Sequence, residues 1–396
     1  MASAALRPQA VRSLKAFALL TMAAAALSGC MPRSRPVQAP PREQAPPVEL
    51  RPMAPSRLPA DETRNRVAVL VPLTGRDAAL GQSILNAANL ALLDTGGQRI
   101  RITAYDTASG AVPAVNDALA EGNGLILGPL LAEDVRAVAP VARGANVPVV
   151  AFSNDISVAG DGVYLMGFTP VQSIERVVSY ARAQGASRFG ALVPANTYGE
   201  RSARAMTEAV EGAGGRLVGI QTYDGNAATG ARAAATRLAG QGQTDAVLIA
   251  DLPRVAMLAA PIIRLASPQP RLLATERWAT ESNIGANVAL RGAWFAAPSD
   301  ANFAAFRTRY RARYTAAPYR LASLGYDAVL LVAGVAADWA IGRPFPVRSL
   351  RNPGGFSGVD GAFRFGRDGI AERALEVREV NATGTTIVSP APRGFN

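Results

Sequence analysis

The apolar positions between residues 66 and 251 fall into short runs that alternate with segments of helical spacing. Strand-like runs such as "RVAVLVP" are continuous or alternate apolar with polar, and helical segments such as "LGQSILNAANLALLD" repeat apolar residues every three or four positions. This alternation predicts right-handed βαβ units, with parallel sheets covered by helices on both faces. Because the pattern is too long for one sheet, we predict an α/β fold with two lobes. Strands are expected at 66–72, 99–106, 124–129, 147–154, 188–195, 216–224 and 244–251, and helices at 80–94, 111–122, 132–145, 169–185, 198–215 and 228–242.

The N-terminal segment has the pattern of a secretory signal peptide. Three basic residues precede "AFALLTMAAAAL", an apolar run too short to span a bilayer as a stable helix. The run ends in Leu27-Ser28-Gly29-Cys30, which resembles a bacterial lipobox. The resemblance implies that residues 1–29 are cleaved off and that Cys30, the only cysteine, is lipidated. Two or more acyl chains would form a stable anchor. The alternative is an ordinary signal peptide with an incidental cysteine.

The segment 30–64 is rich in proline, with arginine, glutamine and few large apolar residues. Such a composition does not bury enough surface to fold, and proline favours extended polyproline II structure. At about 3 Å per residue the segment reaches at most roughly 100 Å. We therefore predict a lipidated tether that holds a globular body away from the membrane.

The composition excludes many kinds of catalytic site. The chain has no histidine, and its one lysine is Lys15, inside the predicted signal peptide. Ser–His, Cys–His and Ser–Lys pairs, Schiff bases and a P-loop lysine are thereby excluded from the mature chain. Histidine and thiolate metal sites are excluded as well, which leaves carboxylate sites for hard cations. We expect no enzyme activity, no cofactor and no metal. Carboxylate-only catalysis stays open, but no carboxylate pair stands out.

The net charge is +11, and +8 without residues 1–29. This basic balance suits anionic lipid headgroups, wall polymers or an acidic partner better than nucleic acid in a secreted chain. The densest basic run is "RTRYRARY" at 307–314. We interpret it as a solvated helix face, with a docking patch as the alternative.

Several segments in order resemble the leucine/isoleucine/valine-binding group of type 1 periplasmic binding proteins. They include "VAVLVPLTGRDAALGQSILNAANLAL", "LGPLLAEDVRAVAPVARGANVPVVAFS", "ANTYGERSARAMTEAVEGAGG", "GYDAVLLVAGVA" and "GVDGAFRFGRDG". The resemblance implies two lobes around a ligand cleft, joined by three crossovers near Phe168, Pro298 and Leu350. The N-terminal lobe would comprise 65–168 and 299–350, and the C-terminal lobe 169–298 and 351–390, followed by a tail at 391–396.

The resemblance also implies cleft residues. In amino-acid-binding members, hydroxyl and backbone N–H groups hold the ligand carboxylate, and an acidic side chain holds the ammonium. Matched by position, that acid is Glu276 and the cleft tyrosine is Tyr198. The remaining candidates are Thr74, Gly75, Ser153, Asp155 and Asp251. The alternative for Tyr198 is a turn residue that caps its lobe, and for Glu276 a solvated acid.

This chain departs from the amino-acid-binding pattern at three positions. Ala132 stands where a serine is expected, Asp155 falls near an expected threonine, and Ala250 or Asp251 replaces a tyrosine. A carboxylate at Asp155 would repel the carboxylate of an amino acid. An ordinary amino-acid site is therefore degraded in this sequence.

A lipobox, a proline-rich tether and a body with a degraded amino-acid site together resemble the penicillin-binding protein activator family. The resemblance implies a non-catalytic, lipid-anchored periplasmic regulator that binds a peptidoglycan synthase, a class A penicillin-binding protein. Enterobacterial members carry a helical-repeat domain where this chain has only the tether. Met31 after the cysteine favours the outer membrane over the inner one, by analogy with enterobacterial sorting. The alternative function is a solute-binding lipoprotein that delivers an amino acid or small polar ligand to an ABC importer.

Overall fold

The computed structural model describes residues 61, 63–224, 227–266, 270–281, 283–392 and 394–395. The predicted signal peptide, Cys30 and most of the predicted tether lie outside these residues. None of the helices in the described part is long and apolar enough to cross a membrane.

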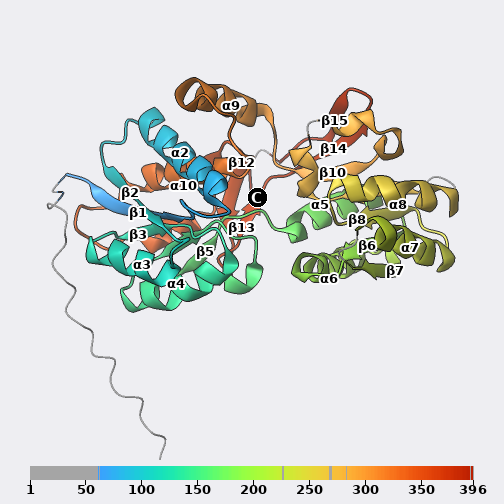
Figure 1. Cartoon of the computed structure of the whole chain (residues 1–396), viewed down its shortest axis with the longest axis horizontal. Coiled ribbons are helices and arrows are strands. Elements are labelled where there is room, and N and C mark those ends of the chain that lie inside the picture. Colours follow the sequence, from blue (N-terminus) through green and yellow to red (C-terminus); the bar gives the residue numbers. More distant parts are fainter. Residues whose placement is uncertain are drawn as a thin grey trace, which may run out of the picture. The chain divides into compact units, whose positions relative to one another are not determined.

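The first lobe is built on a parallel five-stranded sheet of order β2-β1-β3-β4-β5 (Figure 1). Side chains alternate along β1, so that Val67 and Val69 face α2 and α10 while Ala68 and Leu70 face α3 and α4. Both faces are therefore covered, which explains the continuous apolar run of this strand. The elements of the sheet layer are β1 (Asn65–Val71), α2 (Ala78–Asp94), β2 (Ile100–Asp106), α3 (Ala111–Ala120), β3 (Leu125–Leu127), α4 (Ala132–Gly144), β4 (Val149–Ala151), η1 (Ile156–Val158) and β5 (Val163–Leu165).

The second lobe contains a seven-stranded sheet of order β15-β14-β10-β9-β8-β6-β7. The five neighbouring strands β7, β6, β8, β9 and β10 run parallel to one another. Strand β14 pairs antiparallel with β10 on one side and with β15 on the other. Helices α5 and α6 pack on one face, and α7 and α8 pack on the other. Its elements are α5 (Pro170–Ala183), β6 (Arg188–Pro194), α6 (Thr197–Gly212), β7 (Arg216–Tyr223), α7 (Ala227–Gly240), β8 (Ala246–Ile249), α8 (Pro253–Ala266), β9 (Arg271–Ala274), η2 (Glu276–Thr280), η3 (Ile284–Ala286), η4 (Val288–Leu290), β10 (Trp294–Ala297), β14 (Glu376–Asn381) and β15 (Gly384–Ser389).

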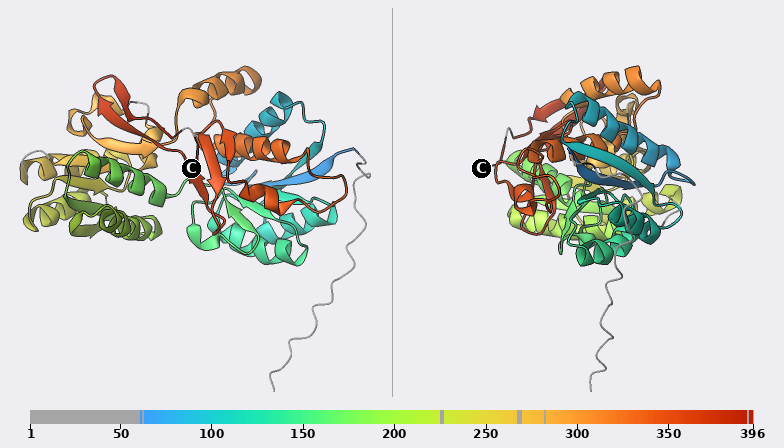
Figure 2. Two further views of the ribbon diagram at one scale, coloured as in Figure 1. Left: turned by 180° about the vertical axis from the view of Figure 1, so that it is seen from behind. Right: turned by 90° about the vertical axis from the view of Figure 1, so that its left-hand side faces the viewer.

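The chain returns to the first lobe after β10. Phe306 and Tyr310 of α9 and most apolar residues of α10 join the core of β1 and α2. A three-stranded antiparallel sheet follows and packs against the same core, as Figure 2 shows from behind. These elements are α9 (Ala301–Tyr314), α10 (Ala322–Val335), η5 (Val347–Arg351), β11 (Phe356–Gly358), β12 (Gly361–Phe365) and β13 (Ala371–Arg373).

The predicted third crossover near Leu350 is therefore wrong. Phe363, Phe365 and Ala371 are buried in the core of the first lobe, and Ile370 bridges to Leu165 at the end of β5. The chain enters the second lobe only after Arg373, so 351–373 belongs to the first lobe. The other two passages lie between β5 and α5 and between β10 and α9, at the places predicted from Phe168 and Pro298.

Hydrogen bonds tie the chain together where it passes between the lobes. Gln172 of α5 donates to the carbonyl of Ala371 at 2.5 Å and accepts from the N–H of Arg373 at 3.0 Å. The Arg373 guanidinium donates to the carbonyl of Met166 at 2.6 Å. Two of the three connections are thus fixed side by side.

Candidate functional site

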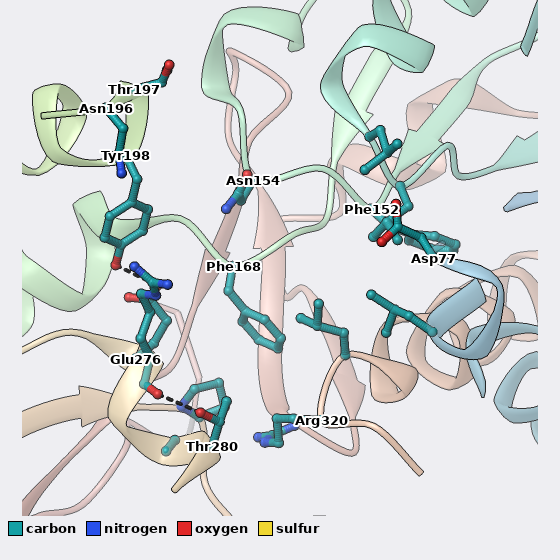
Figure 3. Close-up of a pocket in the computed structure, with 17 residues that line it drawn as sticks. Asp77, Phe152, Asn154, Phe168, Asn196, Thr197, Tyr198, Glu276, Thr280 and Arg320 are labelled. Carbon is teal, nitrogen blue, oxygen red and sulfur yellow. Dashed lines mark hydrogen bonds between the residues drawn. The ribbon is translucent and has the colours of Figure 1, made fainter. Parts of the chain in front are cut away.

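A cavity of about 620 Å³ lies between the two lobes (Figure 3). Its size is in the ordinary range for small-molecule sites. The first lobe contributes mainly apolar side chains, and the second lobe contributes mainly polar ones. The lining residues are Asp77, Leu80, Leu130, Leu131, Phe152, Asn154, Arg320 and Leu321 from the first lobe, Asn196, Thr197, Tyr198, Glu276, Arg277, Ala279 and Thr280 from the second, and Phe168 and Pro298 from the crossovers.

The start of α6 positions Tyr198. The side chain of Asn196 caps the helix by accepting from the N–H of Gly199 at 2.9 Å. A Cβ at Gly199 would lie 1.7 Å from the carbonyl oxygen of Pro194, so only glycine lets α6 approach the end of β6 this closely. Gly81 makes the same approach in the first lobe, where a Cβ would lie 1.8 Å from the Pro72 oxygen. The Tyr-Gly motif is thus a packing requirement that presents the tyrosine to the cavity.

Tyr198 and Glu276 meet in the wall of the cavity, as Figure 3 shows. The Tyr198 hydroxyl donates to Glu276 Oε1 at 3.1 Å and lies 2.8 Å from Thr275 Oγ1. Ser173 of α5 donates to Glu276 Oε2 at 2.6 Å. Burial raises the pKa of the Glu276 carboxyl, although these hydrogen bonds and Arg277 oppose the shift. Burial also raises the pKa of Tyr198 well above its usual range. The pair presents oxygen acceptors to a hydroxyl or a cationic group.

Arg277 and Asp251 support the same wall. The Arg277 guanidinium lies 4.8 Å from the centre of the Tyr198 ring and 3.3 Å from Asp251 Oδ1. Asp251 also accepts from the Tyr223 hydroxyl at 2.8 Å. Asp251 does not line the cavity, and its contact with Arg277 fixes the cation beside Tyr198.

Asp155 connects the lobes, and it does not line the cavity. Its carboxylate lies 2.5 Å from Arg136 of its own lobe and 2.6 Å from Arg201 of α6 in the other lobe. It also accepts from the N–H and hydroxyl of Ser157. Burial alone would raise the pKa of Asp155, but the hydrogen bonds from Ser157 and Arg201 outweigh it and hold the pKa below its usual value. The acid expected to repel a ligand is instead neutralised by the protein's own arginines.

The other predicted residues lie outside the cavity. Ser153 is buried and accepts from the N–H of Asp155 at 3.1 Å. The exposed Thr74 donates to Asp106 at 2.6 Å, and Gly75 takes a left-handed turn with φ of +72° ahead of α2. None of these three residues lines the cavity. Of the seven predicted cleft residues, only Tyr198 and Glu276 line the cavity.

The sequence did not identify Asn154, Phe168 and Arg320 as residues of the cavity. Arg320 precedes α10 and lies 4.2 Å from the centre of the Phe303 ring, with Nη1 bound to the buried Asp360. Asp360 and Asp327 form a buried pair beneath this wall, and burial together with Asp360 raises the pKa of Asp327 to about 7. No spacing in the sequence marks Arg320, because folding alone brings it opposite Glu276. The described residues contain no group of three or more histidine, cysteine or acidic side chains that could hold a metal ion.

Two curated relatives each match about 40% of this chain. It is 24% identical over 162 residues to the uncharacterized protein RP748 of Rickettsia prowazekii, of which it covers 43%. It is 26% identical over 164 residues to the penicillin-binding protein activator LpoA of Photobacterium profundum, of which it covers 27%. The chain thus spans less than half the length of these relatives.

Solved structures share the fold over most of the chain. A putative branched-chain amino acid ABC transporter protein of Rhodospirillum rubrum superposes with a TM-score of 0.71 at 19% identity, covering 82% of this chain and 100% of that one. The sequence model of the periplasmic binding protein family matches residues 65–385, which include both lobes. This chain therefore belongs to the periplasmic binding protein family.

Proposed function

We propose that this protein is a lipid-anchored periplasmic regulator that binds and modulates a peptidoglycan synthase, in the manner of the penicillin-binding protein activators. The partial similarity to the activator of Photobacterium profundum supports this proposal. The regulator would act by docking and would carry out no chemistry of its own. In support, the mature chain would lack histidine and lysine, and its single cysteine would carry lipid.

The observation that carries the proposal is the ion pair between Asp155 and Arg201. In a two-lobed receptor that closes on a solute, the solute supplies the contacts that hold the lobes together. Here a carboxylate of one lobe binds a guanidinium of the other at 2.6 Å, and only 6% of the Asp155 side chain is exposed. The protein's own side chains would therefore keep the lobes closed without a solute. A body of constant shape suits a docking protein better than a solute-gated clamp.

The test is binding of the purified full chain, in detergent micelles, to class A penicillin-binding proteins. We expect a stable complex and altered rates of glycan polymerisation or peptide cross-linking. Arg201→Ala should weaken complex formation, because it loosens the arrangement of the lobes. Arg182→Ala is the matched control, since Arg182 lies in the same lobe and, among the described residues, makes a hydrogen bond only to the Ala213 carbonyl at 3.2 Å. Absence of binding, with unchanged synthase rates, would refute the proposal.

A second candidate is a solute-binding lipoprotein for an ABC importer, which the Tyr198–Glu276 wall favours. A cavity of about 620 Å³ with an oriented acceptor pair has the form of a site for an amino acid or small polar ligand. A ligand that binds only the folded state adds about 3 kcal/mol to the free energy of unfolding at a hundred times its Kd. Thermal unfolding against a panel of amino acids and small amines measures this directly. A shift that Glu276→Gln abolishes would support this function, and no shift across the panel would exclude it for those ligands.

A further inference from the structure

A second cavity of about 560 Å³ opens between the lobes, on the side where α9 faces the η2–η3 segment and the β14–β15 turn. Figure 1 shows α9, β14 and β15 on one side of the body. The first lobe contributes the outer face of α9 and the residues before α10. The second lobe contributes Thr280, Glu281, Thr385, Trp278 and Phe295. None of the seven cleft residues predicted from the sequence lines this cavity, although Arg307 and Arg311 of the predicted basic run do.

Four arginines and two carboxylates line the second cavity. Two of the arginines already have acidic partners within the protein. Arg378 binds Glu376 at 2.7 Å and also Asp300, and Arg320 binds Asp360. The Arg378–Glu376 and Arg320–Asp360 pairs are largely buried, whereas the Asp300 side chain is half exposed. Both arginines are thus neutralised by acids of the protein itself.

The other two arginines, Arg307 and Arg311, have no acidic partner among the residues that the structure describes. Both are exposed, and they stand four residues apart on α9, so their side chains project from one face of the helix. Both line the second cavity. The arginines of the basic run on α9 therefore have different roles. Arg309 forms an ion pair with Asp94 at 2.9 Å on another side of the helix.

The opposite wall of the second cavity carries polar groups that suit a ligand with several hydroxyl groups. Thr280 and Thr385 are exposed and come from the second lobe. Glu281 adds a carboxylate that can accept from sugar hydroxyls but would repel a second anionic group. Phe303, Ala304 and Pro318 form an apolar side. A cavity of this size holds far more than an inorganic anion, since a water molecule occupies only about 30 Å³.

We propose that this second cavity binds a saccharide that carries one phosphate or carboxylate group. The anionic group would lie between the guanidiniums of Arg307 and Arg311, as charge-assisted hydrogen bonds from a pair of arginines favour. The sugar hydroxyls would face Thr280, Glu281 and Thr385. Such a ligand would touch both lobes.

The second cavity shares Ala279, Thr280 and Arg320 with the first one. A ligand bound in one cavity therefore contacts residues that line the other. If binding in the first cavity changes affinity in the second, thermodynamic linkage requires the reverse effect to be equal.

Isothermal titration of the purified full chain, in detergent micelles at low salt, tests the proposal. The probes are glucose 1-phosphate, glucuronate, glucose and inorganic phosphate. We expect at least one of the two charged sugars to bind at least tenfold more tightly than both glucose and inorganic phosphate. The two charged sugars tell a phosphate ligand from a carboxylate ligand. Equal affinity for inorganic phosphate would overturn the assignment of a saccharide.

Variants then place the site. Arg307→Ala with Arg311→Ala should weaken binding of the charged sugar at least tenfold. Arg313→Ala with Arg348→Ala removes the same charge from exposed positions outside the cavity and should change affinity less than twofold. An equal loss in this control pair would show a general charge effect and overturn the proposal. So would unchanged affinity in the Arg307 and Arg311 variant, or no binding of either charged sugar to the unaltered chain.

Discussion

Replacing Arg201 by alanine should weaken the link between the lobes more than replacing Arg136, although both arginines bind Asp155. The two contacts have similar lengths, 2.6 and 2.5 Å, but 20% of the Arg201 side chain is exposed compared with 55% for Arg136. Solvent screens the more exposed pair. Removing one partner of a fully buried pair costs about 3–5 kcal/mol. Allowing for partial exposure, we expect losses in the free energy of unfolding of about 2 kcal/mol for Arg201→Ala and below about 1 kcal/mol for Arg136→Ala.

A double-mutant cycle separates the ion pair from other effects of each substitution. Each arginine is replaced in the unaltered chain and in Asp155→Ala, and the free energy of unfolding is measured by urea denaturation. The coupling energy should be larger for Asp155–Arg201 than for Asp155–Arg136. Small-angle X-ray scattering should show a larger radius of gyration for Arg201→Ala, because the lobes are freed at that point. An Arg201 coupling below about 0.5 kcal/mol, or one no larger than that of Arg136, would refute the reasoning.

The Asp155–Arg201 ion pair should also make the free energy of unfolding depend on pH in the acid range. Since the folded-state pKa of Asp155 is lowered, its contribution to stability is present above the unfolded-state pKa of about 3.9 and is lost as pH falls through the folded-state value. Below about pH 4, the free energy of unfolding should therefore decrease less with falling pH in Arg201→Ala than in the unaltered chain. An unchanged acid profile in this variant would show that the arginine does not lower the pKa of Asp155.

Three further predictions concern single residues. Gly199→Ala should destabilise the protein by at least about 2 kcal/mol, because its Cβ would lie 1.7 Å from the Pro194 oxygen. Gly212→Ala, at the open end of the same helix, is the control and should be neutral or stabilising. Thermal unfolding of both variants checks this. Glu276→Gln should raise the Tm relative to the unaltered chain at pH 7 more than at pH 4, because burial raises the pKa of this carboxyl and its contribution to stability is lost as pH rises above the unfolded-state pKa of about 4.3; an equal difference in Tm at the two pH values would contradict this. Cys30→Ala should release the protein from the membrane fraction with an unchanged melting curve, and membrane retention on fractionation would argue against lipidation of Cys30.

The alternating pattern was enough to predict the α/β fold and the parallel strands of two lobes, because strands buried on two faces require continuous apolar runs. It did not predict the antiparallel strands β14 and β15 or the three-stranded sheet. The segment "TYGERSAR" contains the site residue Tyr198. Its position could be predicted because Asn196 and Gly199 fix the start of α6 through local contacts. The third crossover was predicted wrongly for the opposite reason. Strands β11–β13 are short and half-polar, and nothing local says which lobe's core they join.

The sequence by itself determined the order of strands and helices, the exclusion of histidine and lysine chemistry from the body, and the pairing of Tyr198 with Glu276 as candidates. The first two depend on residue type and local spacing, whereas Tyr198 and Glu276 were candidates because the resemblance to the leucine/isoleucine/valine-binding group implied them. Only the tertiary structure decided that Asp155 binds Arg136 and Arg201, that Arg320 lies between two cavities, and that Arg307 and Arg311 face a cavity while Arg309 pairs with Asp94. The physical reason is that a charge acquires its role from the groups around it. In a two-lobed chain that crosses over three times, those groups come from segments far apart in the sequence.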